Sequence, residues 1–394
     1  MNRRELKPGI EWVGAVDWQR QLFDELIPLP QGTSYNAYLV RGSEKTVLLD
    51  AVDPAFRALL LQRLEGVERI DYLVAHHAEQ DHSGTIPDVL ARFPQAKVLA
   101  TPKGVQFLQE LLAIPAERLQ AVQDGETLAL GGRTLRFLFM PWVHWPETMV
   151  SFLEEDRILF PCDLFGSHLA TSDLFARNEA VVLDAARMYY AQIMMPAAVM
   201  IRKYVERIQA LDPALIAPSH GPVYGRPALI LEAYRRWAGG VVANKVVVPY
   251  VSMHGSTALL VQRLLESLIA RGVTVQPFDL AHLRLDQLAT ALVDAATIVF
   301  AAPAMLGGPH PLAAFVAALV DAFKPPVKFA SYMGSYGWSR GQIGKTAELL
   351  PHLKVEVLEP VLCAGLPRAA DLEAVDRLAA QIAEKHAGLA PTGG

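Results

Sequence analysis

Four side chains that can bind a metal ion fall within one short stretch of the chain. They are His77, Glu79, Asp81 and His82. An apolar run at 70–75 precedes them and a turn-forming sequence at 83–85 follows, which predicts a β-strand before the stretch and a helix after it. On such a loop the first two side chains can face one ion and the last two a second. A solvated polar loop is the alternative, because these residue types are also ordinary on protein surfaces.

Three further candidate ligands each come directly after a predicted strand. They are His144 after 135–140, Asp163 after 157–160 and His220 after 214–217. Rigid strands fix the geometry of ligands held on the loops that follow them. An active site at the edge of a sheet therefore explains this placement better than chance does.

The seven candidates comprise four imidazoles and three carboxylates, with no thiolate. Such a set suits a pair of borderline or hard divalent ions, with Asp163 able to bridge them, and leaves iron, manganese and zinc open. We expect Cys162, next to Asp163, to be a small buried residue that points away from its neighbour, as alternate residues of a continuing strand do.

Composition bounds the class of protein. A chain of 394 residues exceeds what one hydrophobic core usually supports, so we expect two domains. The net charge of −5 and the lack of a basic run give no support to a nucleic-acid or anionic-membrane partner. No apolar run approaches the roughly 18 residues that span a membrane, and no signal peptide is evident. Two distant cysteines, Cys162 and Cys363, argue against disulfides or a rubredoxin module and favour the cytoplasm.

The pattern of predicted elements changes near residues 240–245. The first part is rich in short strands, whereas from residue 245 strands and helices alternate, including a helix expected at 343–350. Regular alternation predicts a parallel, doubly wound α/β domain. We therefore divide the chain into domains at 1–243 and 244–394.

Three loops of the second domain follow predicted strands and could surround a phosphate and a flat ring. The first opens a helix, where hydroxyls and backbone N–H groups bind anions; glycines in the others allow close approach, and two aromatic side chains can stack. Ordinary structural turns are the alternative for each loop. The loop residues are Ser252, Met253, His254, Gly255, Ser256 and Thr257; Pro303, Ala304, Met305, Leu306 and Gly307; and Gly334, Ser335, Tyr336, Gly337 and Trp338.

Taken in order, these motifs resemble the flavodiiron proteins, or A-type flavoproteins. The resemblance rests on His-x-Glu-x-Asp-His from residue 77, His-Trp-Pro-Glu from 144, Cys-Asp-Leu-Phe-Gly from 162, Ser-His-Gly-Pro from 219 and Gly-Ser-Tyr-Gly-Trp from 334. It implies a metallo-β-lactamase-like αβ/βα sandwich followed by a flavodoxin-like FMN domain. Glu79 stands where zinc hydrolases of that superfamily usually carry a second His.

The resemblance also implies roles for the candidate residues. One iron would be held by His77, Glu79 and His144, and the other by Asp81, His82 and His220, with Asp163 bridging. His82 is the ligand on which family members differ. The three loops of the second domain would bind FMN. His254 departs from the Trp often found at its position in the family.

The activity implied is the reduction of dioxygen to water, of nitric oxide to nitrous oxide, or of both. A reduced FMN and a diferrous pair together hold the four electrons that dioxygen requires. Electrons would come from a separate rubredoxin-type donor, and chains would pair head to tail as a dimer or as pairs of dimers. Preference between the two gases would depend on packing around the irons, where Trp142, Trp145 and Tyr38 are candidates.

Two other functions remain open from the sequence. One is a metallo-β-lactamase-type zinc hydrolase with an accessory flavodoxin-like domain, against which Glu79 and the intact loops argue. The other is a non-enzymatic electron-transfer or binding module with a vestigial metal site, against which the complete ligand set argues.

Overall fold

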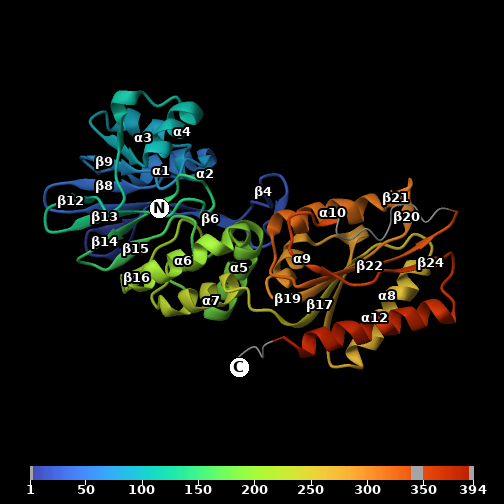
Figure 1. Cartoon of the computed structure of the whole chain (residues 1–394). Helices are drawn as coiled ribbons and strands as arrows, with labels where there is room; N and C mark the ends of the chain where they lie inside the picture. Colours follow the sequence, from blue (N-terminus) through green and yellow to red (C-terminus); the bar gives the residue numbers. More distant parts are fainter. Residues whose placement is uncertain (1–2, 339–348, 390–394) are drawn as a thin grey trace. The chain divides into compact units, whose positions relative to one another are not determined.

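The computed structural model describes residues 3–338 and 349–389 of the chain. The chain forms two compact units, one made of residues 1–190 and 197–235 and the other of residues 191–196 and 236–394 (Figure 1). Each unit has its own sheets and its own core. Among the described helices, none is long and apolar enough to cross a membrane.

Two sheets form the centre of the first unit. The larger has seven strands in the order β1 (Arg4–Lys7), β2 (Ile10–Trp12), β7 (Tyr38–Arg41), β8 (Thr46–Leu49), β9 (Tyr72–Val74), β10 (Lys97–Ala100) and β11 (Leu119–Ala121). The smaller has five, in the order β12 (Thr127–Ala129), β13 (Thr134–Phe139), β14 (Met149–Leu153), β15 (Ile158–Phe160) and β16 (Leu215–Ile216). Two small antiparallel pairs, β3 (Ala15–Asp17) with β6 (Thr33–Tyr35) and β4 (Leu22–Phe23) with β5 (Ile27–Pro28), complete the strands of this unit in the described part of the chain.

The helices of this unit lie outside the sheets (Figure 1). They are α1 (Arg57–Arg63), α2 (Gln80–Ser83), α3 (Ile86–Arg92), α4 (Pro102–Leu112), α5 (Glu179–Tyr189), α6 (Ala198–Gln209) and α7 (Ala228–Ala238). Strand β8 shows how the layers form, because successive strand side chains point to opposite faces. Leu48 packs with α1, α3 and α4, whereas Val47 and Leu49 pack between the two sheets. This layering is the predicted αβ/βα sandwich.

The second unit has one parallel sheet in the order β18 (Thr274–Asp279), β17 (Ala243–Tyr250), β19 (Ala295–Ala301), β22 (Phe329–Tyr336) and β23 (Glu356–Val357), with β24 (Val361–Ala364) also paired to β22. Its helices are α8 (Ser256–Ile269), α9 (Leu285–Leu292), α10 (Pro311–Phe323) and α12 (Ala369–Ala387), and a small hairpin joins β20 (Ala304–Met305) to β21 (Gly308–Pro309).

Helices cover both faces of this sheet, so its central strands are buried throughout. All seven residues of β19 are buried, which explains why the strand reads as an unbroken apolar run. One face packs on α9 and α10 and the other on α8 and α12. The predicted doubly wound, flavodoxin-like sheet is therefore confirmed. The helix expected at 343–350 falls almost entirely outside the described residues.

Candidate functional site

All seven predicted ligands lie at one end of the strands of the first unit. They are supplied by the loop after β9 and by α2 (His77, Glu79, Asp81, His82), and by the loops after β13 (His144), β15 (Asp163) and β16 (His220). Each loop begins where an apolar strand leaves the core, so the polar side chains are fixed by rigid strands behind them. Residues up to 143 positions apart thus reach one place.

One group of side chains gathers around one oxygen of Asp163. His144 Nε2 lies 2.9 Å from Asp163 Oδ2 and 3.1 Å from Glu79 Oε2. His77 Nε2 lies 3.2 Å from Glu79 Oε2 and 3.5 Å from Asp163 Oδ2. The ligand atoms of these four residues all lie within 4.8 Å of one another, which is close enough to hold a single ion.

A second group gathers around the other oxygen of Asp163. His82 Nε2 lies 3.1 Å from both Asp163 Oδ1 and Asp81 Oδ2. His220 Nε2 lies 3.3 Å from Asp81 Oδ2 and 3.0 Å from His82 Nε2. The His82 ring nitrogen therefore faces the cluster together with the others. Asp163 presents one oxygen to each group, which is the geometry of a bridging ligand.

The chemistry of this cluster fits a pair of divalent cations. Both oxygens of Asp81 are buried and form no well-aligned hydrogen bond within the described part of the chain, although Oδ2 lies close to the ring nitrogens of His82 and His220. A buried carboxylate that lacks well-formed hydrogen bonds costs free energy, and a cation at the centre would remove that cost. Imidazole and carboxylate ligands without thiolate suit iron, manganese or zinc.

Charge within the cluster shifts the pKa values of its histidines. Burial alone would lower the pKa of His82, but Asp81 and Asp163 outweigh it and raise that pKa to about 10. Burial likewise opposes the carboxylates of Asp163 and Glu79, which raise the pKa of His144 to about 9. Without metal, both rings are therefore protonated at neutral pH.

These shifts predict opposite pH dependences for metal binding and for metal-free stability. Binding requires neutral imidazoles, so apparent Fe(II) affinity should rise with pH between 6 and 8, by about tenfold per unit for each proton released.

The stabilisation that these charged imidazoles give the metal-free protein is complete below about pH 6.5, which is the pKa of histidine in the unfolded chain. It is lost as pH rises through 9 to 10. Metal competition titrations and melting temperatures measure the two effects. At high pH the melting temperature of a His82→Gln variant should fall less than that of the unaltered protein. An equal fall would contradict the raised pKa of His82.

The second ring nitrogens of two ligands are held from behind. His220 Nδ1 donates to the Ser34 carbonyl at 2.6 Å, and His77 Nδ1 lies 3.1 Å from Cys162 Sγ. Such partners fix the tautomer and orientation of a ligand. Cys162 is buried as expected, but the expectation that it points away is wrong: β15 ends at Phe160, and Cys162 has a φ of +54°, which turns its thiol toward His77.

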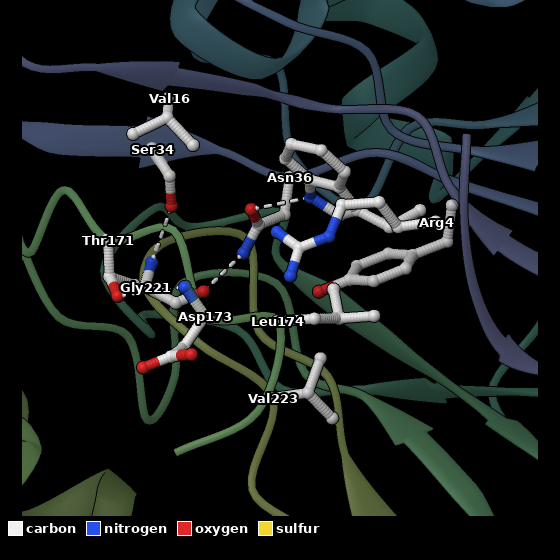
Figure 2. A pocket seen from close by; sticks show the side chains of 11 residues that line it. Arg4, Val16, Ser34, Asn36, Thr171, Asp173, Leu174, Gly221 and Val223 are labelled. Carbon is white, nitrogen blue, oxygen red and sulfur yellow. Dashed lines mark hydrogen bonds between the residues drawn. The ribbon is translucent and has the colours of Figure 1, made fainter. Parts of the chain in front are cut away.

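The loop that carries His220 is held by the side chain of Asn36, which sequence reasoning missed (Figure 2). The Asn36 amide donates to the carbonyls of Pro218 at 2.8 Å and Gly221 at 2.7 Å, while its oxygen accepts from Trp12 Nε1 at 2.8 Å. Ser34 Oγ also accepts from the Gly221 amide at 2.7 Å. The only local signal for Asn36 was its position on the strand-like run 34–40, two residues beyond Ser34.

We expect Asn36→Ala to destabilise the first unit by about 2–4 kcal/mol, because it removes three buried hydrogen bonds and leaves Trp12 Nε1 and the Gly221 carbonyl without those partners. The iron position that includes His220 should lose its metal before the other iron position does. Urea unfolding and iron content measure both effects. Asn178→Ala, which removes an exposed helix cap, should cost only about 1 kcal/mol and leave iron content unchanged. Equal effects of the two variants would contradict the role of Asn36.

Aromatic rings pack directly on the ligands, though not all those expected. The ring of Trp145 lies 5.9 Å from that of His77, and Tyr35 lies 6.5 Å from His82 and 6.0 Å from His220. Tyr38 instead donates to the Pro218 carbonyl at 2.8 Å, and Trp142 is 60% exposed. Tyr35, and not the expected Tyr38, thus packs beside the cluster.

A cavity of about 360 Å³ lies in the second unit, at the carboxyl ends of its parallel strands. Predicted loop residues that line it are Ser252, Met253, His254, Ser256, Thr257, Pro303, Ala304, Ser335, Tyr336, Gly337 and Trp338. The lining does not include the predicted residues Gly255, Met305, Leu306, Gly307 and Gly334. Gly365 and Leu366, which follow β24, also line it and were not predicted.

The cavity fits a phosphorylated, flat-ringed cofactor such as FMN. Its volume is within the range of roughly 300–1,000 Å³ for small-molecule sites. It borders the start of α8, where Ser252 Oγ orders the turn by accepting from the amides of Gly255 and Ala258, each at 3.2 Å. A helix N-terminus with ordered amides favours a phosphate. Tyr336 and Trp338 supply aromatic surface for a ring.

Comparisons with known proteins agree with this architecture. A family model described as ODP family beta lactamase matches residues 33–221, a range that contains all seven candidate ligands. The nitric oxide reductase of Moorella thermoacetica is 34% identical over 393 residues, covering 96% of this chain and 98% of that protein.

Two solved structures match nearly the whole chain. Rubredoxin oxygen:oxidoreductase from the anaerobe Desulfovibrio gigas has a TM-score of 0.94 at 30% identity, covering 98% of each chain. The flavodiiron protein from Giardia intestinalis has a TM-score of 0.92 at 27% identity, covering 99% of this chain and 98% of that one. Because relatives 34–35% identical to it are matched over most of both chains, this chain belongs to the flavodiiron, or type A flavoprotein, family.

Proposed function

We propose that this chain is an oxidoreductase that reduces dioxygen to water, nitric oxide to nitrous oxide, or both, at a non-haem diiron site. FMN would deliver the electrons from an external rubredoxin-type donor. The observation that carries the proposal is the placement of Asp163, with one carboxylate oxygen directed at each of two groups of ligands. The names of the Moorella and Desulfovibrio relatives support both the substrates and the donor.

We assign His77, Glu79 and His144 to one iron and Asp81, His82 and His220 to the other, with Asp163 between them. Two iron ions bound there would supply the redox chemistry for a diatomic gas. Asp163 sets their spacing, while Cys162 and the Ser34 carbonyl hold the rings of His77 and His220 in place. Ser219 donates a hydrogen bond to Asp163 Oδ1 at 2.5 Å and fixes the carboxylate on that side.

The same residues decide how the gas enters and how water is excluded. The side chains of His144 and Glu79 are 19% and 14% exposed, whereas that of Asp163 is only 3% exposed. The gas would therefore arrive past His144 and Glu79. Trp145 and Tyr35 close the cluster on other sides with apolar ring surface, which keeps bulk water away from it.

For the second domain, 244–394, we assign FMN to the predicted loops from Ser252 to Thr257, Pro303 to Gly307 and Gly334 to Trp338, together with Gly365 and Leu366. Exposed apolar side chains gather on these loops: Leu306 is 90% exposed and Leu366 66% exposed, and Trp338 is fully exposed. Large apolar side chains exposed together mark a surface that another molecule covers.

We propose that a second copy of the chain covers this apolar surface. The two chains would pair head to tail, so that the FMN of one chain serves the irons of the other. The donor would then approach the same flavin from outside the dimer. Two free, buried cysteines are consistent with the cytoplasm as the compartment. Light scattering during size-exclusion chromatography should give the mass of a dimer or of a pair of dimers; a monomer would overturn this assembly.

The first experiment is the metal and flavin content of anaerobically purified protein, followed by gas consumption with reduced rubredoxin. We expect about two irons and one FMN per chain, with the ratio of the rates under dioxygen and nitric oxide deciding the preferred substrate. Two zincs, little FMN and no consumption of either gas would overturn the proposal and favour a hydrolase of the metallo-β-lactamase type.

A further inference from the structure

Two arginines of the first unit meet at one tryptophan. The guanidinium carbon of Arg63 lies 4.5 Å from the centre of the Trp12 ring, and that of Arg4 lies 5.5 Å from it. Neither arginine forms an ion pair with any carboxylate in the described part of the chain. The neighbouring Arg3, by contrast, lies 3.3 Å from Glu11.

Arg63 is also buried, which makes the lack of an anionic partner costly in free energy. Only 7% of the residue is exposed, and its Nε and Nη1 atoms are buried with no hydrogen-bond acceptor among the described residues. Burial lowers the pKa of Arg63, and the charge of Arg4 lowers it further. A buried guanidinium with free donors is expected to have an anionic partner.

Both arginines line a cavity of about 540 Å³. Trp12 and Trp18 supply its aromatic walls, and Thr171 and Ser172 supply hydroxyl groups. Trp18 is 61% exposed, so its ring is free to stack on a ligand. Within the described chain, none of the lining residues belongs to the metal cluster or to the flavin loops.

We propose that this cavity binds a small aromatic anion, in which a carboxylate or phosphate group is attached to a flat ring. The guanidinium forks of Arg4 and Arg63 match the geometry of carboxylate or phosphate oxygens. The exposed indole ring of Trp18 would cover the flat part of the ligand, since offset or edge-on aromatic contacts add to the area buried. A purely inorganic anion would leave that aromatic wall without a partner.

The cavity has a defined relation to the metal cluster. It shares Arg4, Trp12, Val16 and Thr171 with a narrow pocket of about 10 Å³ that Figure 2 shows from close by. That pocket reaches Asn36 and Gly221, the residues that hold the loop of His220. A ligand in the larger cavity would therefore lie behind this loop and away from the gas.

The test is calorimetric titration of the FMN-loaded, iron-loaded protein with benzoate, AMP, inorganic phosphate and benzyl alcohol. We expect benzoate or AMP, or both, to bind once per chain with a Kd below about 1 mM, with the tighter of the two identifying the anionic group. Inorganic phosphate and benzyl alcohol should bind at least tenfold more weakly. No binding of benzoate or AMP, or equal binding of inorganic phosphate or of benzyl alcohol, would overturn the proposal.

Variants locate the site. Arg63→Met and Arg4→Met should each weaken binding at least tenfold, and Trp18→Ala should weaken the aromatic probes more than it weakens phosphate. Arg3→Met, which changes a neighbouring arginine outside the cavity, should leave binding unchanged. Arg4 and Trp18 are less buried than Arg63, so their variants decide the matter if Arg63→Met does not fold. Unchanged binding in Arg4→Met and Trp18→Ala would refute the site.

Discussion

Replacing Asp163 with alanine should abolish gas reduction and remove iron from the protein. The two oxygens of this carboxylate face the two groups of candidate ligands, at 2.9 Å from His144 Nε2 and 3.1 Å from His82 Nε2. Substituting a residue that merely supports a ligand already costs about 10–100-fold in affinity or activity. Loss of a shared ligand should therefore lower the rate at least ~100-fold and reduce iron from about two per chain to one or fewer.

Iron analysis and anaerobic gas consumption measure this effect, while the FMN content reports on the second domain. FMN should remain at about one per chain, because Asp163 lies in the other unit. Asp88→Ala is the matched control: it removes an aspartate that pairs with Arg57 at 3.3 Å on the surface of α3, so iron and rate should be unchanged. An Asp163→Ala variant that retained two irons and full activity would refute the bridging role.

Gly334→Ala should strongly weaken the binding of FMN and leave the binding of iron unchanged. A Cβ atom at this position would overlap the carbonyl oxygen of Ala302 and come within 3.1 Å of the Tyr332 ring. Gly334 is the first residue of one loop assigned to FMN and Ala302 directly precedes another, so relief of the overlap must move those loops. We expect about 3 kcal/mol of destabilisation and at least a tenfold weaker affinity for FMN.

Flavin fluorescence released on dilution measures the affinity, and iron content should stay at about two per chain. Gly388→Ala provides the control, because its Cβ would meet only the Lys385 carbonyl oxygen at 3.5 Å and its φ of −83° suits alanine. If Gly334→Ala bound FMN as tightly as the unaltered protein, the loops would have to be assigned to another role.

The two substitutions separate the functions of the two units. Loss of iron with FMN retained, and loss of FMN with iron retained, would show that each cofactor depends on its own domain. Gas reduction should fail in both variants, because the irons need electrons and the electrons need an acceptor.

Much of the fold was predictable from local pattern. Strand β19 reads as an apolar run because helices cover both of its faces, and the loops after successive parallel strands meet at one edge by geometry alone. The break between α5 and α6 was not predictable: residues 190–194 form a turn of π-helix and residues 195–197 a turn of 3₁₀-helix. Short-range periodicity does not register such a change of winding.

The candidate site was likewise predictable in part. Residue type and position after a strand were enough to select His77, Glu79, His144 and the other four candidate ligands, because coordination chemistry is a property of each side chain. The sequence by itself thus determined which groups could bind metal, the change from one domain type to the other and three loops that could hold a cofactor.

Only the tertiary structure decided how those groups are arranged. The direction of each Asp163 oxygen, the turn of Cys162 toward His77, the hold of Asn36 on a loop 182 residues away and the meeting of Arg4 with Arg63 all depend on packing between distant segments. Local patterns carry no information on such contacts, because the same residue types at the same spacing could face solvent instead. The physical reason is that a buried polar group is oriented by the partners that the whole fold brings to it.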